Sequence, residues 1–336
     1  MSDPWAARLL DLDSAASFGP GALGPRLPRF LAWQAERWPR LAAARASLEE
    51  IHVKELRCGD RRVLAQFNPA RAVSTTAAVD AASIAARPCF LCPGSLPPEE
   101  RGLPFQADWV LLANPAPILP GHLVLAHRAH RSQAVVDALP AMVELAVATA
   151  DRCAVIYNGP ACGASAPDHL HLQAVDAGLL PEEQAGWHPA GEPFLTRPHL
   201  EAWAVLEEGR TYLGFRGEPA RVRRALTAAV EALATALGDP GEPLLNLLAT
   251  SRGGEVLALL FPRAAHRPAR YGAPEPERML ISPGALDMAG ALVTVRAQDF
   301  ARLDAPTALG IYREVSLPPA TLRPVIALLQ RRLSHA

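Results

Sequence analysis

The stretch that most constrains the fold covers residues 158–173, where a glycine-rich turn leads into alternating polar and apolar residues. Its last five residues read His-Leu-His-Leu-Gln, from His169 to Gln173. Successive side chains of a β-strand point to opposite faces, so the alternation predicts that His169, His171 and Gln173 share one face. Two imidazoles and an amide on one face of a short strand are typical of a functional site rather than of a core.

The composition excludes several classes of protein. A chain of 336 residues with 50% hydrophobic residues can form a large core, or two half-domains packed together. The net charge of −1 gives no electrostatic reason for a nucleic-acid partner. We expect neither a signal peptide nor a membrane span, because residues 1–10 lack a basic region followed by an apolar run and no stretch approaches the roughly 20 apolar residues of a span. Five cysteines, an odd number, argue against a disulfide framework and favour a cytoplasmic location. We expect a monomer or homodimer without membrane or nucleic-acid partners.

The succession of strands and helices predicts three regions. Residues 1–50 have helical spacing and form an N-terminal helical segment, followed by two halves at 51–185 and 186–336. Both halves contain strands with an intervening helix, which indicates a duplication. An alanine-rich linker is expected over 74–86. The first half is predicted to contain strands over 51–56, 62–67, 109–113, 122–126 and 154–157 and a helix over 139–152; the second contains strands near 200–216, 244–249 and 255–261 and helices over 221–237 and 317–334.

Cys89 and Cys92 form a Cys-x-x-Cys pair, a spacing that supplies two ligands of a tetrahedral zinc site. Two histidines would complete the site. A redox dithiol is disfavoured because neither Pro nor Gly lies between the cysteines, and two ordinary cysteines remain the other alternative. The candidate histidines are His122, His127, His130 and His169.

His171 is the candidate nucleophile, because a neutral imidazole attacks a phosphoryl group well and also leaves it readily. It needs one free ring nitrogen and the other held as N–H by an acceptor, often a backbone carbonyl. Upstream, the turn from Gly163 to Ser165 and the amide of Asn158 offer groups that can bind phosphate oxygens. The alternatives are a structural histidine and an ordinary turn.

Two further segments carry candidate substrate-binding residues. Asn68 and Arg71 follow a predicted strand, and Arg263, His266 and Arg267 follow another. Arginine can contact phosphate through two parallel hydrogen bonds. Because lysine occurs once in the chain, arginine abundance alone does not indicate phosphate binding. Solvated loops are the alternative for both segments.

The segment 157–173 resembles the histidine-triad superfamily, and more closely the branch of galactose-1-phosphate uridylyltransferase, diadenosine tetraphosphate phosphorylase and the GDP-hexose phosphorylases. The likeness lies in a Gly/Ser turn followed by His-x-His-x-Gln. Further segments at 66–71, 244–263 and 281–290 also resemble elements of these relatives. The resemblance implies an α+β fold of duplicated histidine-triad-like halves, each an antiparallel sheet with flanking helices, plus the N-terminal helical segment.

The resemblance implies a nucleotidyltransferase or phosphorylase that acts on a dinucleoside polyphosphate or nucleotide sugar through a covalent nucleotidyl-histidine. By position in the motif, His171 is the nucleophile, with Ser165 and Gln173 as further catalytic residues. Triad hydrolases carry a third histidine at the position of Gln173. The glutamine implies an acceptor other than water, such as phosphate or a phosphorylated molecule.

The uridylyltransferase pattern also implies a zinc ligand set of Cys89, Cys92, His130 and His169, with His130 preferred to His127. Two departures affect this reading. Leucine lies between the paired histidines where uridylyltransferases have proline, which favours the phosphorylase branches. Many dinucleotide phosphorylases lack the Cys-x-x-Cys pair.

Two other functions stay open on the same scaffold. A nucleotide-binding protein without turnover is disfavoured because His169, His171 and Gln173 are all intact. A nucleotide hydrolase is disfavoured by the glutamine at position 173.

Overall fold

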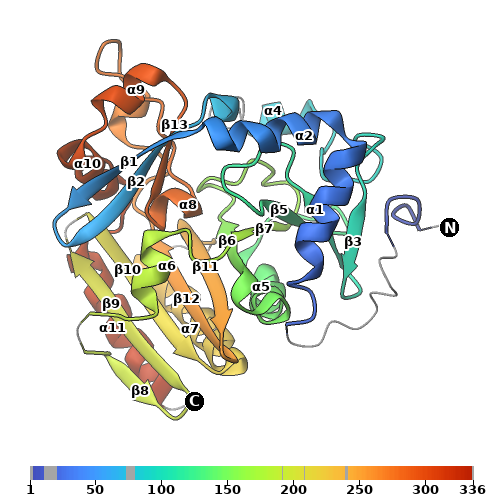
Figure 1. Cartoon of the computed structure of the whole chain (residues 1–336). Helices are drawn as coiled ribbons and strands as arrows, with labels where there is room; N and C mark the ends of the chain where they lie inside the picture. Colours follow the sequence, from blue (N-terminus) through green and yellow to red (C-terminus); the bar gives the residue numbers. More distant parts are fainter. Residues whose placement is uncertain are drawn as a thin grey trace.

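A ten-stranded antiparallel sheet runs through the computed structural model (Figure 1), which describes residues 3–10, 21–72, 80–190, 192–207, 209–238 and 241–334. Its strand order is β3-β4-β5-β7-β6-β11-β12-β10-β9-β8. The first five of these strands come from the first half of the chain and the other five from the second half. One sheet therefore joins both halves.

The two halves have the same topology, which confirms the expected duplication. In each half the chain forms three strands, a helix and two more strands, and the last strand inserts beside the third. The halves meet where β6 pairs with β11, with Asn158 opposite Asn246. The elements are β3 (Gly102–Phe105), β4 (Trp109–Ala113), β5 (Leu123–His127), α5 (Val135–Thr149), η3 (Ala150–Arg152), β6 (Cys153–Asn158) and β7 (His171–Asp176), then β8 (Leu195–Arg197), β9 (Leu200–Glu207), β10 (Arg210–Gly217), α7 (Pro219–Leu237), β11 (Leu245–Arg252) and β12 (Glu255–Pro262).

Helices cover one face of the sheet. The apolar faces of α5, α7 and α11 (Pro319–Ser334) pack on alternate residues of the strands. Leu170 and Leu172 belong to this core and are fully buried. The alternation therefore turns His171 and Gln173 toward the opposite face, as predicted.

The opposite face is covered by a small sheet built from distant parts of the chain. The predicted hairpin forms β1 (His52–Cys58) and β2 (Arg61–Phe67), and β13 (Ala291–Thr294) pairs in parallel with β2. In Figure 1 this small sheet lies beside α8 (Ala285–Met288), α9 (Ala297–Arg302) and α10 (Ala305–Val315). The other helices around it are η2 (Pro69–Arg71), α6 (Pro181–Gly186) and η4 (Ala269–Tyr271).

The N-terminal segment is helical where it is described, with α1 (Arg26–Arg37), α2 (Pro39–Ala46) and η1 (Ser47–Glu50). Of the predicted linker, residues 74–79 lie outside the described residues, and α4 (Ala81–Ala85) occupies most of the rest. The boundaries at residues 50 and 185 remain predictions. In the described part of the chain, no helix is both long and apolar enough to cross a membrane.

Candidate active site and metal centre

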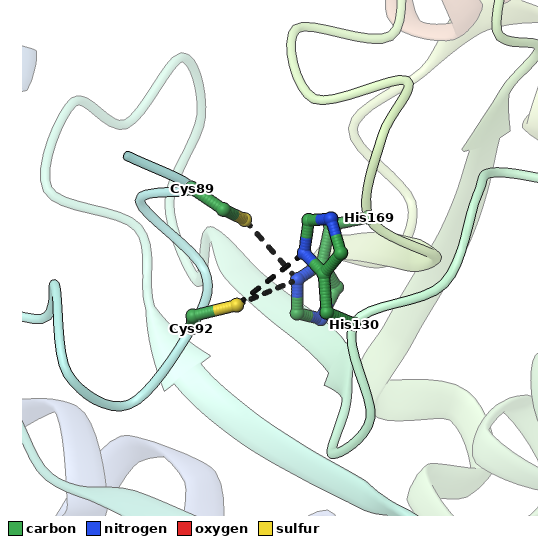
Figure 2. Close-up of side chains that lie close together, drawn as sticks. All are labelled: Cys89, Cys92, His130 and His169. Carbon is green, nitrogen blue, oxygen red and sulfur yellow. Dashed lines mark hydrogen bonds between the residues drawn. The ribbon is translucent and has the colours of Figure 1, made fainter. Parts of the chain in front are cut away.

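Four side chains from three loops form a compact cluster. Cys89 and Cys92 follow α4, His130 follows β5, and His169 precedes β7. Figure 2 shows the two thiols facing the two imidazoles. The Nδ1 atom of His169 lies 3.2 Å from Sγ of Cys89 and 3.6 Å from Sγ of Cys92, and Nδ1 of His130 lies 3.4 Å from Sγ of Cys92.

The geometry of this cluster fits tetrahedral zinc. With zinc–sulfur and zinc–nitrogen bonds of about 2.3 and 2.0 Å, neighbouring ligand atoms of a tetrahedron lie roughly 3.3–3.8 Å apart. The observed contacts are close to that range, and all four ligand atoms lie within 4.8 Å of one another. Nε2 of His169 lies 2.7 Å from the carbonyl oxygen of His127, so Nε2–H donates and Nδ1 is free for a metal. His127 thus contributes its backbone to the centre.

His169 departs from the predicted strand pattern, because β7 begins at His171. The N–H of His169 donates to the carbonyl of Ala166 at 3.1 Å, which closes a turn just before the strand. This turn directs the imidazole toward the cysteines. The prediction that all three polar side chains share one strand face was therefore wrong for His169, and within the strand the pattern holds for His171 and Gln173.

His171 has the tautomer that a nucleophile needs. Its Nδ1 lies 2.8 Å from the carbonyl oxygen of His169, so Nδ1–H donates and the lone pair is on Nε2. No described residue forms a hydrogen bond with Nε2. The side chain is 4% exposed, and burial lowers the pKa of the imidazole, which keeps it neutral.

Gln133, which the sequence did not single out, holds the backbone of His171. Its Oε1 accepts from the N–H of His171 at 2.8 Å, and its Nε2 donates to the carbonyls of Asn158 and His171 at 2.9 and 3.0 Å. The pairing of β6 with β7 ends at Ile156 and Gln173. The buried amide replaces the strand ladder where the two strands separate to make room for the site.

We expect Gln133→Ala to lower both stability and turnover. The change leaves buried backbone groups without partners, which costs roughly 1–3 kcal/mol each and loosens the start of β7. Urea unfolding measures the first effect and kcat the second. Gln330→Ala is a matched control, because Gln330 donates to the carbonyl of Phe194 on the helical side of the sheet. Equal losses of kcat in both variants would contradict a specific role for Gln133.

A pocket open to solvent lies between the start of β7 and the small sheet. It brings together residues from both halves of the chain, including five of the predicted substrate-binding residues and two of the predicted catalytic residues. His171 does not line it, but lies two residues before Gln173 on the same strand face. The polar lining residues are Arg71, Asn158, Ser165, Gln173, His266, Arg267, Ser282 and Asp287, with Gly163 and Gly284 between them.

The polar groups of the pocket are suited to an anionic ligand. Burial lowers the pKa of Arg71 to about 10, so this guanidinium remains charged at neutral pH. Arg267 lies over the ring of Tyr271 and donates to Oγ of Ser282 at 3.0 Å. Burial raises the pKa of Asp287 to about 6, and its carboxylate accepts from backbone N–H groups of Gly284 and Val293. Burial and two nearby arginines lower the pKa of His266 to about 4, so it is neutral.

Close backbone approach fixes the shape of the pocket at Gly163, which has φ +100°. A Cβ atom there would lie 3.3 Å from Cα of Gly284. Between them, Oδ1 of Asn158 accepts from the N–H of Ala285 at 2.8 Å and from Nδ2 of Asn246 at 2.9 Å. Asn158 thus ties the glycine-rich turn to the 281–290 segment.

Two predicted substrate-binding residues have other positions. Arg263 is 2% exposed, and its five N–H groups all donate within the protein, so it supports the pocket loops rather than presenting a free donor. Asn68 is buried beneath the loop before β5, with Nδ2 3.5 Å from the carbonyl of Pro117. The acceptors of Arg263 are Asn246 Oδ1 and the carbonyls of Val315, Pro283, Ala265 and His266.

The overall architecture matches solved structures at low sequence identity. Yeast Ap4A phosphorylase Apa2 in complex with AMP is 15% identical, with a TM-score of 0.55 over 83% of this chain and 96% of that chain. Its complex with Ap4A is 17% identical, with a TM-score of 0.54 over 83% and 97%. The fold is of the histidine-triad type. The fold that the motif implied is thereby confirmed.

Two further comparisons give weaker or shorter matches to this chain. A structure of uridylyltransferase is 14% identical, with a TM-score of 0.41 over 73% of this chain and 91% of that chain. The model of a domain of unknown function, DUF4922, matches residues 30–176. This span includes the four cluster residues and His171. A comparison with curated protein sequences finds no match.

Proposed function

We propose that the protein is a nucleotidyltransferase that acts on a dinucleoside polyphosphate or nucleotide sugar through a covalent nucleotidyl-His171. Phosphate or a phosphorylated molecule is the acceptor. The observation that carries the proposal is the state of His171: Nδ1–H is bound to a carbonyl, and Nε2 has no partner among the described residues. This nucleophile lies on the strand face that leads into a pocket with two arginines.

The reaction proceeds in two displacements. In the first, the Nε2 lone pair attacks the α-phosphorus, the nitrogen–phosphorus bond forms, and the leaving phosphate takes the electrons of the broken phosphorus–oxygen bond. In the second, an acceptor oxygen attacks the same phosphorus and Nε2 recovers its lone pair. The carbonyl of His169 stabilises the positive charge that develops on the ring between the two steps. Two inversions give net retention at phosphorus.

Several pocket residues are placed to stabilise the transferring group. Gln173, Ser165 and Asn158 line the pocket next to His171 and offer donors to the phosphoryl oxygens. Arg71 and Arg267 neutralise charge on the remaining phosphates. Cys89, Cys92, His130 and His169 would hold zinc, which joins three loops and fixes the carbonyl that His171 binds. The zinc would have a structural role only.

A product screen tests the proposal. Dinucleoside polyphosphates and nucleotide sugars are incubated with the protein, with and without inorganic phosphate, and the nucleotide products are separated. Attack of phosphate on a nucleotidyl-histidine yields a nucleoside diphosphate, so we expect this product only when phosphate is present. Nucleoside monophosphate in both conditions would indicate a hydrolase. Saturable binding without products, with phosphate or with a sugar phosphate as the acceptor, would indicate a binding protein.

A further inference from the structure

His122 is a buried histidine next to the pocket, outside the cysteine–histidine cluster, and its tautomer follows from its neighbours. It is 3% exposed and immediately precedes β5. The backbone N–H of Ile118 donates to Nδ1 of His122 at 3.0 Å. Because this backbone group can only donate, Nδ1 carries the lone pair and the neutral ring has its hydrogen on Nε2. Burial and the charge of Arg71 lower the pKa of His122 to about 3, so the ring stays neutral.

The hydrogen on Nε2 determines the orientation of the Gln173 amide. Nε2 of His122 lies 2.7 Å from Oε1 of Gln173, so Nε2–H donates to this oxygen. The NH₂ group of Gln173 then points away from His122, and no described residue accepts from it. Since Gln173 lines the pocket, its two N–H groups remain for a ligand.

A second contact of the His122 ring does not change this assignment. Nδ2 of Asn114 lies 3.1 Å from the same Nε2. Oδ1 of Asn114 already accepts from the N–H of Ala116 at 2.9 Å, which fixes the NH₂ group toward the ring. Because Nε2 carries a hydrogen, it has no lone pair for this amide. The bond to Gln173 is therefore the one that Nε2 makes.

The loop that supplies the Ile118 N–H is held by the end of β2 and by η2. Nε2 of Gln66 donates to the carbonyl of Ile118 at 2.8 Å, and Nη1 of Arg71 donates to the carbonyl of Ala116 at 2.8 Å. Asn68 contacts the carbonyl between them. The segment 66–71 thus holds the loop whose Ile118 N–H donates to the imidazole of His122.

The geometry points to His122 as a positioning residue that turns the N–H groups of Gln173 toward the transferring phosphoryl group. The inference rests on the proposed function. An amide that donates to a phosphoryl oxygen stabilises the charge there, whereas the reversed amide would place its own oxygen against an anion. A glutamine without this restraint would sample both orientations. His122 therefore selects the donating one.

A double-mutant cycle tests this role. His122→Phe keeps a ring of similar size but removes the donor, and His122→Gln restores an N–H near the position of Nε2. We expect His122→Phe to lower kcat about 10- to 100-fold with little change in KM, because the lost contact acts mainly on the transition state. We expect His122→Gln to recover most of kcat.

The decisive comparison is made in a Gln173→Ala background. If His122 acts through Gln173, adding His122→Phe to Gln173→Ala lowers kcat no further. Equal factors in both backgrounds, or unchanged kcat in His122→Phe, would overturn the role of His122 while leaving the proposed function standing. A wild-type protein that transfers no nucleotide would overturn both.

Nitrogen NMR of the histidine-labelled wild-type protein gives a measurement of the tautomer that does not depend on activity. We expect the ring signals of His122, assigned by their loss in His122→Gln, to show hydrogen on Nε2 at neutral pH. A ring with hydrogen on Nδ1 would contradict the proposed orientation of Gln173.

Discussion

His171→Gly should abolish covalent labelling of the protein. With a nucleotide substrate labelled at the α-phosphate, the wild-type protein should retain label that is lost in acid and stable in alkali. A phosphorus–nitrogen bond to histidine has this stability. The variant lacks the only atom proposed to attack phosphorus, so we expect no label and a fall in kcat of at least about 10⁴-fold. Scintillation counting of denatured protein and steady-state turnover measure the two effects.

The control for this experiment is His188→Gly, because His188 is exposed and does not line the pocket. We expect this variant to keep its label and its turnover. Circular dichroism of both variants checks that they are folded. Undiminished label in folded His171→Gly would assign the nucleophile to another residue and refute the proposed mechanism.

Removal of the metal should impair both the fold and the chemistry. We expect about one zinc per chain in the wild-type protein and loss of this zinc in Cys92→Ser. Without the metal, His169 is held only by its hydrogen bonds to Ala166 and His127, and its carbonyl is the acceptor for Nδ1–H of His171. We therefore expect a lower melting temperature and a fall in kcat of about 10- to 100-fold. Elemental analysis, thermal unfolding and turnover are measured on the same samples.

Cys153→Ala is the matched control, because Cys153 is a buried free thiol of β6 outside the cluster. This variant should retain its zinc, and its core substitution should lower the melting temperature without a comparable loss of kcat. Readdition of zinc to chelator-treated wild-type protein should restore activity. Metal-free protein that is folded and fully active would contradict the role of the cluster.

Local patterns predicted the strands well but not their neighbours. The apolar run Trp109–Ala113 forms β4 over those same residues. A five-residue apolar run between turn signals is too short for a typical helix and is typical of a fully buried strand. The pairing of Asn158 with Asn246 joins strands almost ninety residues apart. The parallel pairing of β13 with β2 places Ala291 opposite Leu64, which are more than two hundred residues apart. No local pattern encodes such contacts, since they depend on how the assembled layers pack.

The site shows the same division. The alternating motif predicted that His171 and Gln173 share a strand face, and the role of His171 as nucleophile stays a prediction. The Cys-x-x-Cys spacing predicted two metal ligands, and the family resemblance implied the other two, His130 and His169, which lie in the cluster. Gln133 and His122 were missed as supporting residues, because a single amide or imidazole next to a strand has no diagnostic spacing. Arg263 and Arg267 were indistinguishable in the sequence, and only burial separates the supporting arginine from the one that lines the pocket.

The continuous pairing of β6 with β11 limits how the protein can move. Opening the molecule like a hinge between its two halves would break the ladder that joins Val155–Asn158 to Asn246–Ala249 at the centre of the sheet. The halves must therefore behave as one rigid platform. The pocket is closed on its other sides by segments outside the large sheet, among them the glycine-rich turn and residues 282–287, so a ligand can enter it without any change in the β6–β11 ladder.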